Sequence, residues 1–222
     1  MEKKTILEME HIVKKYPDLT AVNDVDFSIS KGEIVAIIGP SGSGKSTLLR
    51  IICGTYAPSE GTVRADRRQI TLLALGAGFD HELSGRENVY LNGALCGYSR
   101  AFLDAHYEEI VAFAGLEGFM EEKVRHYSSG MVSRLAFAIA SAGQVSGVLI
   151  LDEVLSVGDR FFREKSEKRI RELISGGTAV LIVSHSTTVL RRICSRVLWI
   201  EKGELRMDGA PDAVCLAYEK RK

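Results

Sequence analysis

The stretch that decides the fold is Gly39-Pro40-Ser41-Gly42-Ser43-Gly44-Lys45-Ser46-Thr47. It follows a branched apolar run, 34–38, typical of a buried parallel strand, and precedes an apolar run, 48–53, that indicates a helix. A glycine-rich loop between strand and helix is the setting that the pattern G-x-x-x-x-G-K-[ST] requires. Its glycines let successive N–H groups point at one anion, and the helix start adds partial positive charge. The stretch therefore predicts binding of a nucleoside triphosphate; the alternative is a plain Gly/Ser turn.

Two side chains of this loop have expected roles. The Lys45 ammonium would reach the β- and γ-phosphates, and the Ser46 hydroxyl would ligate Mg²⁺. The cofactors expected from the loop are thus ATP and Mg²⁺.

Length and composition narrow the class of protein. The 222 residues suit one α/β domain with a sizeable core. The 29 acidic and 29 basic residues balance, so no overall charge attracts nucleic acid. No apolar run approaches the ~18 residues of a membrane span, and no signal peptide is evident. We therefore expect a protein that serves any membrane from the cytosol through a partner. The dispersed cysteines predict buried, reduced thiols: Cys53, Cys96, Cys194 and Cys215.

Alternating strands and helices indicate the architecture. The first thirty residues alternate apolar and polar side chains, as in strands with one buried face. Residues 84–143 have a helical texture and suggest a separate lobe. Beyond them, strands alternate with helices, which indicates a parallel sheet covered on both faces. We expect strands at 62–65, 70–74, 148–151, 179–183 and 197–200, and helices at 86–95, 101–115, 129–142, 163–174, 187–194 and 211–220.

Two carboxylates end the apolar run 148–151. Asp152 would hold Mg²⁺, directly or through water. Glu153 would be the general base that orients and deprotonates the attacking water. An acidic helix cap is the alternative for both residues.

A histidine follows the apolar run 179–183, after Ser184. In parallel sheets the carboxyl ends of the strands line the ligand crevice. Gly39, Asp152 and His185 should therefore lie along one edge. His185 would bond the γ-phosphate and hold the geometry of water at Glu153; the alternative is a structural histidine.

A second anion-binding arrangement is Tyr127-Ser128-Ser129-Gly130-Met131, which precedes an alanine-rich helix. One chain has no evident use for two phosphate sites on one triphosphate. Two chains do, if each offers this segment to the nucleotide held by the other. The alternative is a Ser N-cap.

This ordered series of motifs resembles the ATPase subunits of ATP-binding cassette transporters over essentially the whole chain. The resemblance implies an α/β P-loop NTPase fold, with a RecA-like parallel sheet, an N-terminal antiparallel β subdomain and a helical subdomain at about 84–143 of a single 1–222 domain. It implies that Tyr16 stacks on adenine. Ser128 and Gly130 would contact the γ-phosphate of a partner subunit, and the loop 156–159, including Asp159, would cross between two subunits of a homodimer.

Departures from that family's pattern point to one branch. Ser129 and Met131 replace the usual Gly and Gln of the signature, and Leu75 stands near the place of the usual coupling Gln. The segments 75–79 and 83–88, with Tyr127–Met131, look like the branch that exports capsular polysaccharide, O-antigen or teichoic acid chains. The resemblance implies an integral-membrane permease as partner and a peripheral position on the cytoplasmic face.

Two other functions remain open at this stage. One is a cassette for small-molecule transport; the other is a soluble cassette acting on nucleic acid or the ribosome, against which the single cassette and balanced charge argue. Within the exporter reading, residues of the middle lobe would contact the permease, or alternatively form subdomain core: Phe79, Asp80, His81, Leu83, Tyr90 and Leu95.

Overall fold

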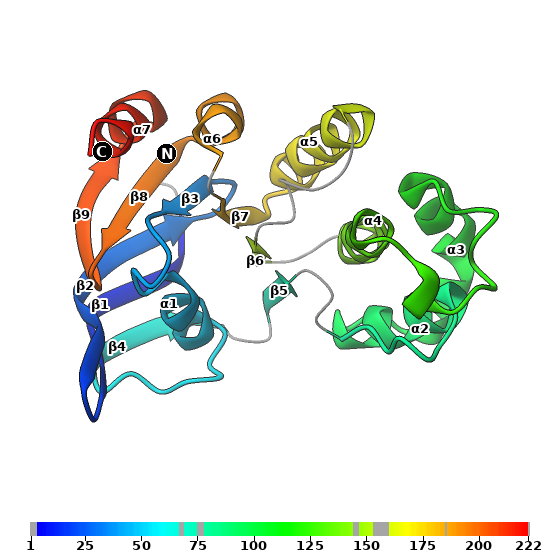
Figure 1. Cartoon of the computed structure of the whole chain (residues 1–222), viewed down its shortest axis with the longest axis horizontal. Helices are drawn as coiled ribbons and strands as arrows, with labels where there is room; N and C mark the ends of the chain where they lie inside the picture. The colour runs from blue at the N-terminus through cyan, green and yellow to red at the C-terminus, as the bar shows by residue number, and fades with distance from the viewer. Residues whose placement is uncertain are drawn as a thin grey trace.

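The computed structural model describes residues 4–66, 69–74, 78–143, 147–152, 160–184 and 186–221. Within these ranges, two sheets and a set of helices account for most of the chain. The helices α2 (Gly85–Leu95), α3 (Arg100–Ala114) and α4 (Ser129–Ala140) lie at one end of the molecule (Figure 1). The strands β1 (Thr5–Tyr16), β2 (Leu19–Ser30) and β4 (Glu60–Ala65) lie at the other end.

The N-terminal strands form an antiparallel sheet. β1 (Thr5–Tyr16) lies between β2 (Leu19–Ser30) and β4 (Glu60–Ala65). Alternate side chains such as Leu7 and Met9 are fully buried, as the apolar–polar alternation predicts for a sheet with one covered face. The expected antiparallel strands are confirmed.

The second sheet has the strand order β5-β6-β7-β3-β8-β9. Its first five strands are parallel, and β9 runs antiparallel to β8. The last strand was not expected from the sequence, because its polar residues carry little apolar periodicity. The bounds are β3 Ile34–Ile38, β5 Ile70–Ala74, β6 Val148–Asp152, β7 Ala179–Val183, β8 Arg196–Glu201 and β9 Glu204–Gly209.

The parallel strands are buried on both faces, which explains their continuous apolar runs. Successive β3 side chains enter opposite cores because side chains alternate along a strand. Ala36 and Ile38 pack in a cluster with helical side chains. Val35 and Ile37 pack in a second cluster with β1, β2 and the first helix. The strand β3, which leads into the phosphate loop, is therefore packed on both faces of the sheet.

The helices lie close to their expected positions. The main differences are at helix starts: α1 begins at Lys45 and α5 at Arg160, both three residues before the apolar pattern predicts. The first turn of α1 is polar and carries no periodicity, so the sequence pattern misses it, whereas at α5 the pattern left out two apolar residues, Phe161 and Phe162. The bounds are α1 Lys45–Ile52, α2 Gly85–Leu95, α3 Arg100–Ala114, η2 Val124–His126, α4 Ser129–Ala140, α5 Arg160–Ser175, α6 Thr187–Ile193 and α7 Pro211–Glu219.

The middle helices share a core with the main sheet. Buried side chains of α3 and α4, such as Leu103 and Phe137, belong to the same cluster as Leu149 of β6. We keep as a proposal that residues of about 84–143 form a subdomain within a single 1–222 domain.

Two further expectations meet the structure here. Cys215 is buried, but Cys53, Cys96 and Cys194 are only half-buried, so the expectation of four buried thiols is wrong for three. Burial is still enough to raise the pKa of Cys53 and Cys96 to about 11. Among the described residues, no helix has both the length and the apolarity that crossing a membrane would need.

Candidate functional site: a phosphate loop at the carboxyl edge of the sheet

The glycine-rich loop joins β3 to α1 and is shaped by left-handed backbone. Gly42 has φ +73° and Gly44, the N-cap of α1, has φ +104°. Glycine adopts these values without the steric cost that a Cβ brings. No side chain in the described chain caps α1, and no acidic residue occupies its first turn. The helix start therefore presents amide N–H groups and positive dipole with no competing anion of its own.

Two glycines are required by close backbone approach. A Cβ at Gly39 would collide with the carbonyl oxygen of Ile200 in β8 and would lie 2.7 Å from Ser43 Oγ. A Cβ at Gly44 would collide with the carbonyl oxygen of Ala21 in β2. At Gly42, by contrast, the added carbon would meet nothing within 4 Å. The loop is thus tightly packed against β2 and β8 at Gly39 and Gly44 and open to solvent at Gly42, as a phosphate-binding loop requires.

Lys45 lies inside this loop and is largely buried. Its ammonium donates to the carbonyl oxygens of Gly39, at 2.8 Å, and Pro40, at 2.7 Å. Ser43 Oγ lies 3.4 Å from the same nitrogen. These contacts hold the positive charge at the rim where phosphates would arrive.

The exposure of the remaining loop residues matches their expected use. Ser41 and Ser46 are exposed, and Thr47 is half-buried. The Ser46 hydroxyl is thus open to solvent at the start of α1, in keeping with a role in holding Mg²⁺. The donors at this site are hydroxyl and carboxylate oxygens, the ligands that Mg²⁺ prefers.

Strand register places Asp152 on the same edge of the sheet. Asp152, the last residue of β6, is paired with Val183 of β7, and Val183 is paired with Ile37 of β3. Asp152 therefore stands level with the end of β3, two strands away, or about 10 Å across the sheet. The Asp152 side chain is half-buried. The expected convergence of Asp152 with the loop is thus met by the topology.

The third strand end at this edge carries Ser184. This residue is buried, and its hydroxyl accepts a hydrogen bond from the backbone N–H of Ser186 at 3.1 Å. This hydrogen bond ties the backbone of Ser186 to the end of β7. Several expected residues lie outside the described part of the chain: Leu75, Glu153, Asp159 with the rest of 156–159, and His185.

Tyr16 ends β1 and is connected to α1 by a series of cation–π contacts. Lys14 Nζ lies 5.6 Å from the centre of the Tyr16 ring and 5.9 Å from that of Tyr56. Arg50 of α1 lies over the Tyr56 ring at 5.1 Å and donates to its hydroxyl at 2.7 Å. Tyr16 itself is 40% exposed, so it has ring surface left for a ligand. Sequence reasoning missed Lys14, Arg50 and Tyr56, because single charged and aromatic residues carry no motif.

The segment before α4 has the geometry of a helix cap. Ser128 is exposed, and its hydroxyl accepts from the backbone N–H of Met131 at 3.2 Å. Gly130 lies in the first turn, with only Ser128 Oγ within 4 Å of an added Cβ. The N-cap alternative is therefore present in the structure. It does not exclude a ligand role, because the remaining first-turn amides still face outward from a positive helix end.

Tyr127 connects this cap to the start of α2 and to the turn that follows α3, which the sequence did not predict. Its hydroxyl donates to the carbonyl oxygen of Phe119 at 2.7 Å, and a Cβ at Gly85 would collide with it. Burial raises the pKa of Tyr127 to about 12, so the hydroxyl stays protonated and remains a donor. Figure 1 shows α4 separated from α1, the helix that follows the phosphate loop, by β5 and β6.

The residues expected at a permease contact divide into two groups. Phe79 is buried, in agreement with the core alternative. Leu83 and Tyr90 are half-buried, and the Tyr90 hydroxyl donates to Asp104 at 2.8 Å. The exposed members are Asp80, His81 and Leu95, of which Leu95 is 69% exposed.

Comparison with known proteins shows which family this chain belongs to. A family model described as "ABC transporter" matches residues 22–156. "O-antigen export system ATP-binding protein RfbB" of Klebsiella pneumoniae is 42% identical over 200 residues, covering 90% of this chain and 81% of that protein. "Teichoic acids export ATP-binding protein TagH" of Lactococcus lactis is 37% identical, covering 93% of this chain but 44% of that protein.

Solved structures agree on the fold. The ATP-binding cassette MJ0796, solved as a dimer in a post-hydrolysis state with ADP and Pi, has a TM-score of 0.81 at 27% identity, over 93% of this chain and 99% of that one. An ATP-binding subunit of an ABC transporter has a TM-score of 0.86 at 24% identity, over 98% of this chain and 95% of that one. The P-loop NTPase fold expected from the sequence is confirmed. With a family model over more than half of its length and relatives above 30% identity, the chain belongs to the ABC transporter family.

Proposed function

We propose that this chain is the ATP-hydrolysing subunit of an exporter that moves a cell-surface polysaccharide, of the O-antigen or teichoic acid class, across the cytoplasmic membrane. The observation that carries the proposal is the likeness to export ATPases at 42% and 37% identity over nine-tenths of the chain. A third relative, "ABC transporter protein AbcA" of Aeromonas salmonicida, is 40% identical over 90% of the chain and supports the same family.

ATP would be held by the loop described above. The backbone of 39–44 and the start of α1 would bind the phosphates, Lys45 would leave its carbonyl partners for the β- and γ-oxygens, and Tyr16 would stack on adenine. Ser46 and Asp152 would hold Mg²⁺, which supplies neutralising charge on the phosphates when bound. The opening of the loop to solvent and the register of Asp152 support this arrangement.

Hydrolysis would use Glu153 as the base for the attacking water, with His185 bonding the γ-phosphate. Glu153 follows β6 and His185 follows β7, neighbouring strands whose ends are level. Both roles rest on that placement along the chain, since the two side chains lie outside the described residues.

A second copy of the chain would complete the site. Ser128 and Gly130 would bind the γ-phosphate held by the partner subunit, and Asp159 would lie at the crossing. The position of β5 and β6 between α4 and α1 (Figure 1) supports this division, and so does the dimeric state of the related cassette. The dimer would associate peripherally with the cytoplasmic face of the membrane through a separate permease. Asp80, His81 and Leu95 are exposed for that contact.

The test is export by a reconstituted complex. The chain is purified with a candidate permease from the same organism, placed in proteoliposomes, and assayed for ATP hydrolysis with and without a lipid-linked polysaccharide. We expect the glycan to stimulate hydrolysis and Glu153→Gln to abolish turnover while ATP binding persists. Glu164→Gln, on the exposed side of α5, is the matched control and should behave as wild type. Stimulation by small molecules but not by glycan would overturn the proposed cargo, and turnover in Glu153→Gln would overturn the proposed base.

A further inference from the structure

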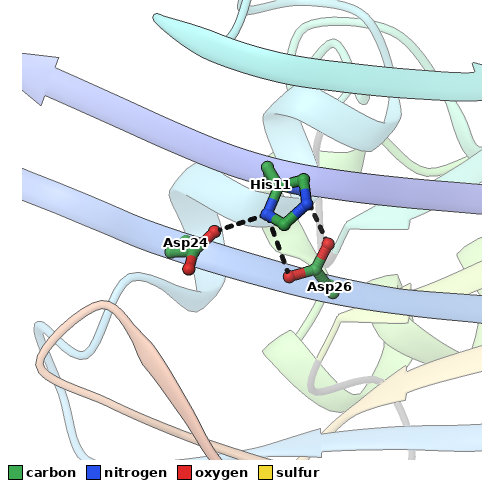
Figure 2. A group of neighbouring side chains, drawn as sticks. All are labelled: His11, Asp24 and Asp26. Atoms are coloured by element: carbon green, nitrogen blue, oxygen red, sulfur yellow. Dashed lines mark hydrogen bonds and ion pairs between the residues drawn. The ribbon is translucent and has the colours of Figure 1, made fainter.

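A histidine and two aspartates that have no role in the proposed ATP site converge on the antiparallel sheet. His11 of β1 lies against Asp24 and Asp26 of β2 (Figure 2). The three ligand atoms all lie within 4.8 Å of one another. In the described part of the chain, no other group of three His, Cys, Asp or Glu residues meets this spacing.

Two β-bulges bring these side chains together. Between the pairs Met9↔Phe27 and Ile12↔Val25, β1 has two residues where β2 has one, so His11 lies in a bulge opposite Asp26. Between Ile12↔Val25 and Lys14↔Val22 the excess is on β2, and it includes Asp24. His11 and Asp24 both adopt positive φ, 52° and 50°. Bulges re-aim side chains, and here one on each strand turns both toward the same point.

His11 and Asp24 share a hydrogen bond, and the separations of the ligand atoms are also compatible with a cation that would replace it. His11 Nδ1 lies 2.9 Å from Asp24 Oδ1 and 3.7 Å from Asp26 Oδ2. Two ligand atoms bound tetrahedrally at ~2.1 Å stand about 3.4 Å apart, a value these two distances bracket. A small rotation of either carboxylate would equalise them.

One carboxylate is already oriented. Asp26 Oδ1 accepts a hydrogen bond from the backbone N–H of His11 at 2.6 Å, which leaves Oδ2 turned toward the ring nitrogen. Such outer hydrogen bonds fix the orientation of metal ligands. The side chains of His11, Asp24 and Asp26 are 79%, 67% and 49% exposed, so water can fill the remaining coordination positions.

We propose that His11, Asp24 and Asp26 form a surface site for one divalent transition cation of the Zn²⁺ type. One imidazole with two carboxylates suits Zn²⁺ and its neighbours better than Mg²⁺, which prefers oxygen ligands alone. The two negative charges balance the cation. The bound ion joins β1 to β2 and so stiffens the strand that ends in Tyr16.

The experiment is calorimetric titration of metal-free protein with Zn²⁺ in excess Mg²⁺. The variants are His11→Asn and Asp24→Asn, because asparagine tolerates positive φ and preserves the bulges. The matched control is His126→Asn, whose imidazole faces a single carboxylate, Glu122, at 3.4 Å. Wild type and the three variants would bind any Zn²⁺ at the cysteines or at the phosphate site equally. Differences in Zn²⁺ affinity between these proteins therefore report on the cluster of His11, Asp24 and Asp26.

We expect wild type and His126→Asn each to bind one equivalent of Zn²⁺ at this site. His11→Asn and Asp24→Asn should bind that equivalent at least about tenfold more weakly. Zn²⁺ should also raise the melting temperature of wild type and not that of the two variants. A second readout uses wild type alone: the ring nitrogens of His11 should shift on adding Zn²⁺ in an NMR titration. Equal binding by all four proteins, or no Zn²⁺-dependent shift at His11, overturns the proposal.

Discussion

The Lys45 ammonium donates a 2.8 Å hydrogen bond to the carbonyl oxygen of Gly39, the first residue of its own loop. The charge proposed to receive phosphate is thus positioned before any nucleotide arrives. A nucleotide replaces carbonyl partners with anionic ones, which form stronger hydrogen bonds.

Replacing Lys45 with alanine should weaken ATP binding by about 10- to 100-fold, because a hydrogen bond to a charged group contributes about 1.5–3 kcal/mol. Fluorescent-nucleotide titration measures the effect. Lys168→Ala, an exposed lysine of α5, is the control and should leave affinity unchanged. Unaltered ATP affinity in Lys45→Ala would contradict the assignment of the loop.

Two of the three glycines of the loop, Gly39 and Gly42, should respond differently to alanine. Gly39→Ala pushes a methyl group into the Ile200 carbonyl, so we expect a loss of about 3 kcal/mol in the free energy of unfolding. Gly42→Ala meets open space and bears only the cost of positive φ, about 1 kcal/mol. Urea denaturation measures both, with Gly118→Ala as a control that has neither problem. A Gly42→Ala variant less stable than Gly39→Ala would refute the packing argument.

Substitutions at Ser128 separate the cap from the proposed contact with a partner's γ-phosphate. Ser128→Ala removes the cap and should cost about 1 kcal/mol of stability. Ser128→Asp can still cap α4 but places a negative charge where phosphate would bind. We therefore expect Ser128→Asp to fold stably yet fail to form an ATP-dependent dimer, as measured by size-exclusion chromatography with light scattering.

The matched control for this experiment is Ser99→Asp. Ser99 caps α3 by accepting from the Phe102 N–H at 3.2 Å, in the same helical region but outside the signature segment. It should dimerise normally. If Ser128→Asp also dimerises with ATP and hydrolyses it, Ser128 is a cap and nothing more.

The capping box of α2 predicts a pH dependence. Glu87 accepts from the Ser84 backbone N–H at 2.8 Å and from the Ser84 hydroxyl, which lowers the pKa of Glu87 below its ordinary value of 4.5. A lowered folded-state pKa adds stability above pH 4.5 that is lost as the pH falls through the folded value. Glu87→Gln keeps the cap without the charge. Wild type should therefore be the more stable at pH 7, and the difference should vanish in acid.

Chemical denaturation from pH 7 to pH 3 measures this difference. Glu109→Gln, an exposed carboxylate in the middle of α3, serves as the control. A stability difference between wild type and Glu87→Gln that persists unchanged at pH 3 would show that the charge is not its source.

The sequence by itself determined most of the helices and strands and the phosphate loop, but not β9. The strands Ile70–Ala74 and Ala179–Val183 have the predicted bounds, because a short branched apolar run between turn residues has few other buried solutions. The loop could be recognised from the sequence because its glycines, lysine and serine must lie close together along the chain to surround one phosphate. The roles of Glu153, Asp159 and His185 remain predictions from sequence.

Only the tertiary structure decided which distant residues meet. Register brings Asp152 level with Ile37 through Val183, and paired bulges bring His11 to Asp24 and Asp26. The sequence predicted that Asp152 and the loop share one edge of the sheet, but strand order, which sets their spacing, and bulge position are fixed by packing across the whole sheet. The same holds for the Ile200 carbonyl, whose approach makes glycine necessary at position 39. The local sequence pattern therefore specified the helices, strands and phosphate loop, and non-local packing specified how far apart their functional residues lie.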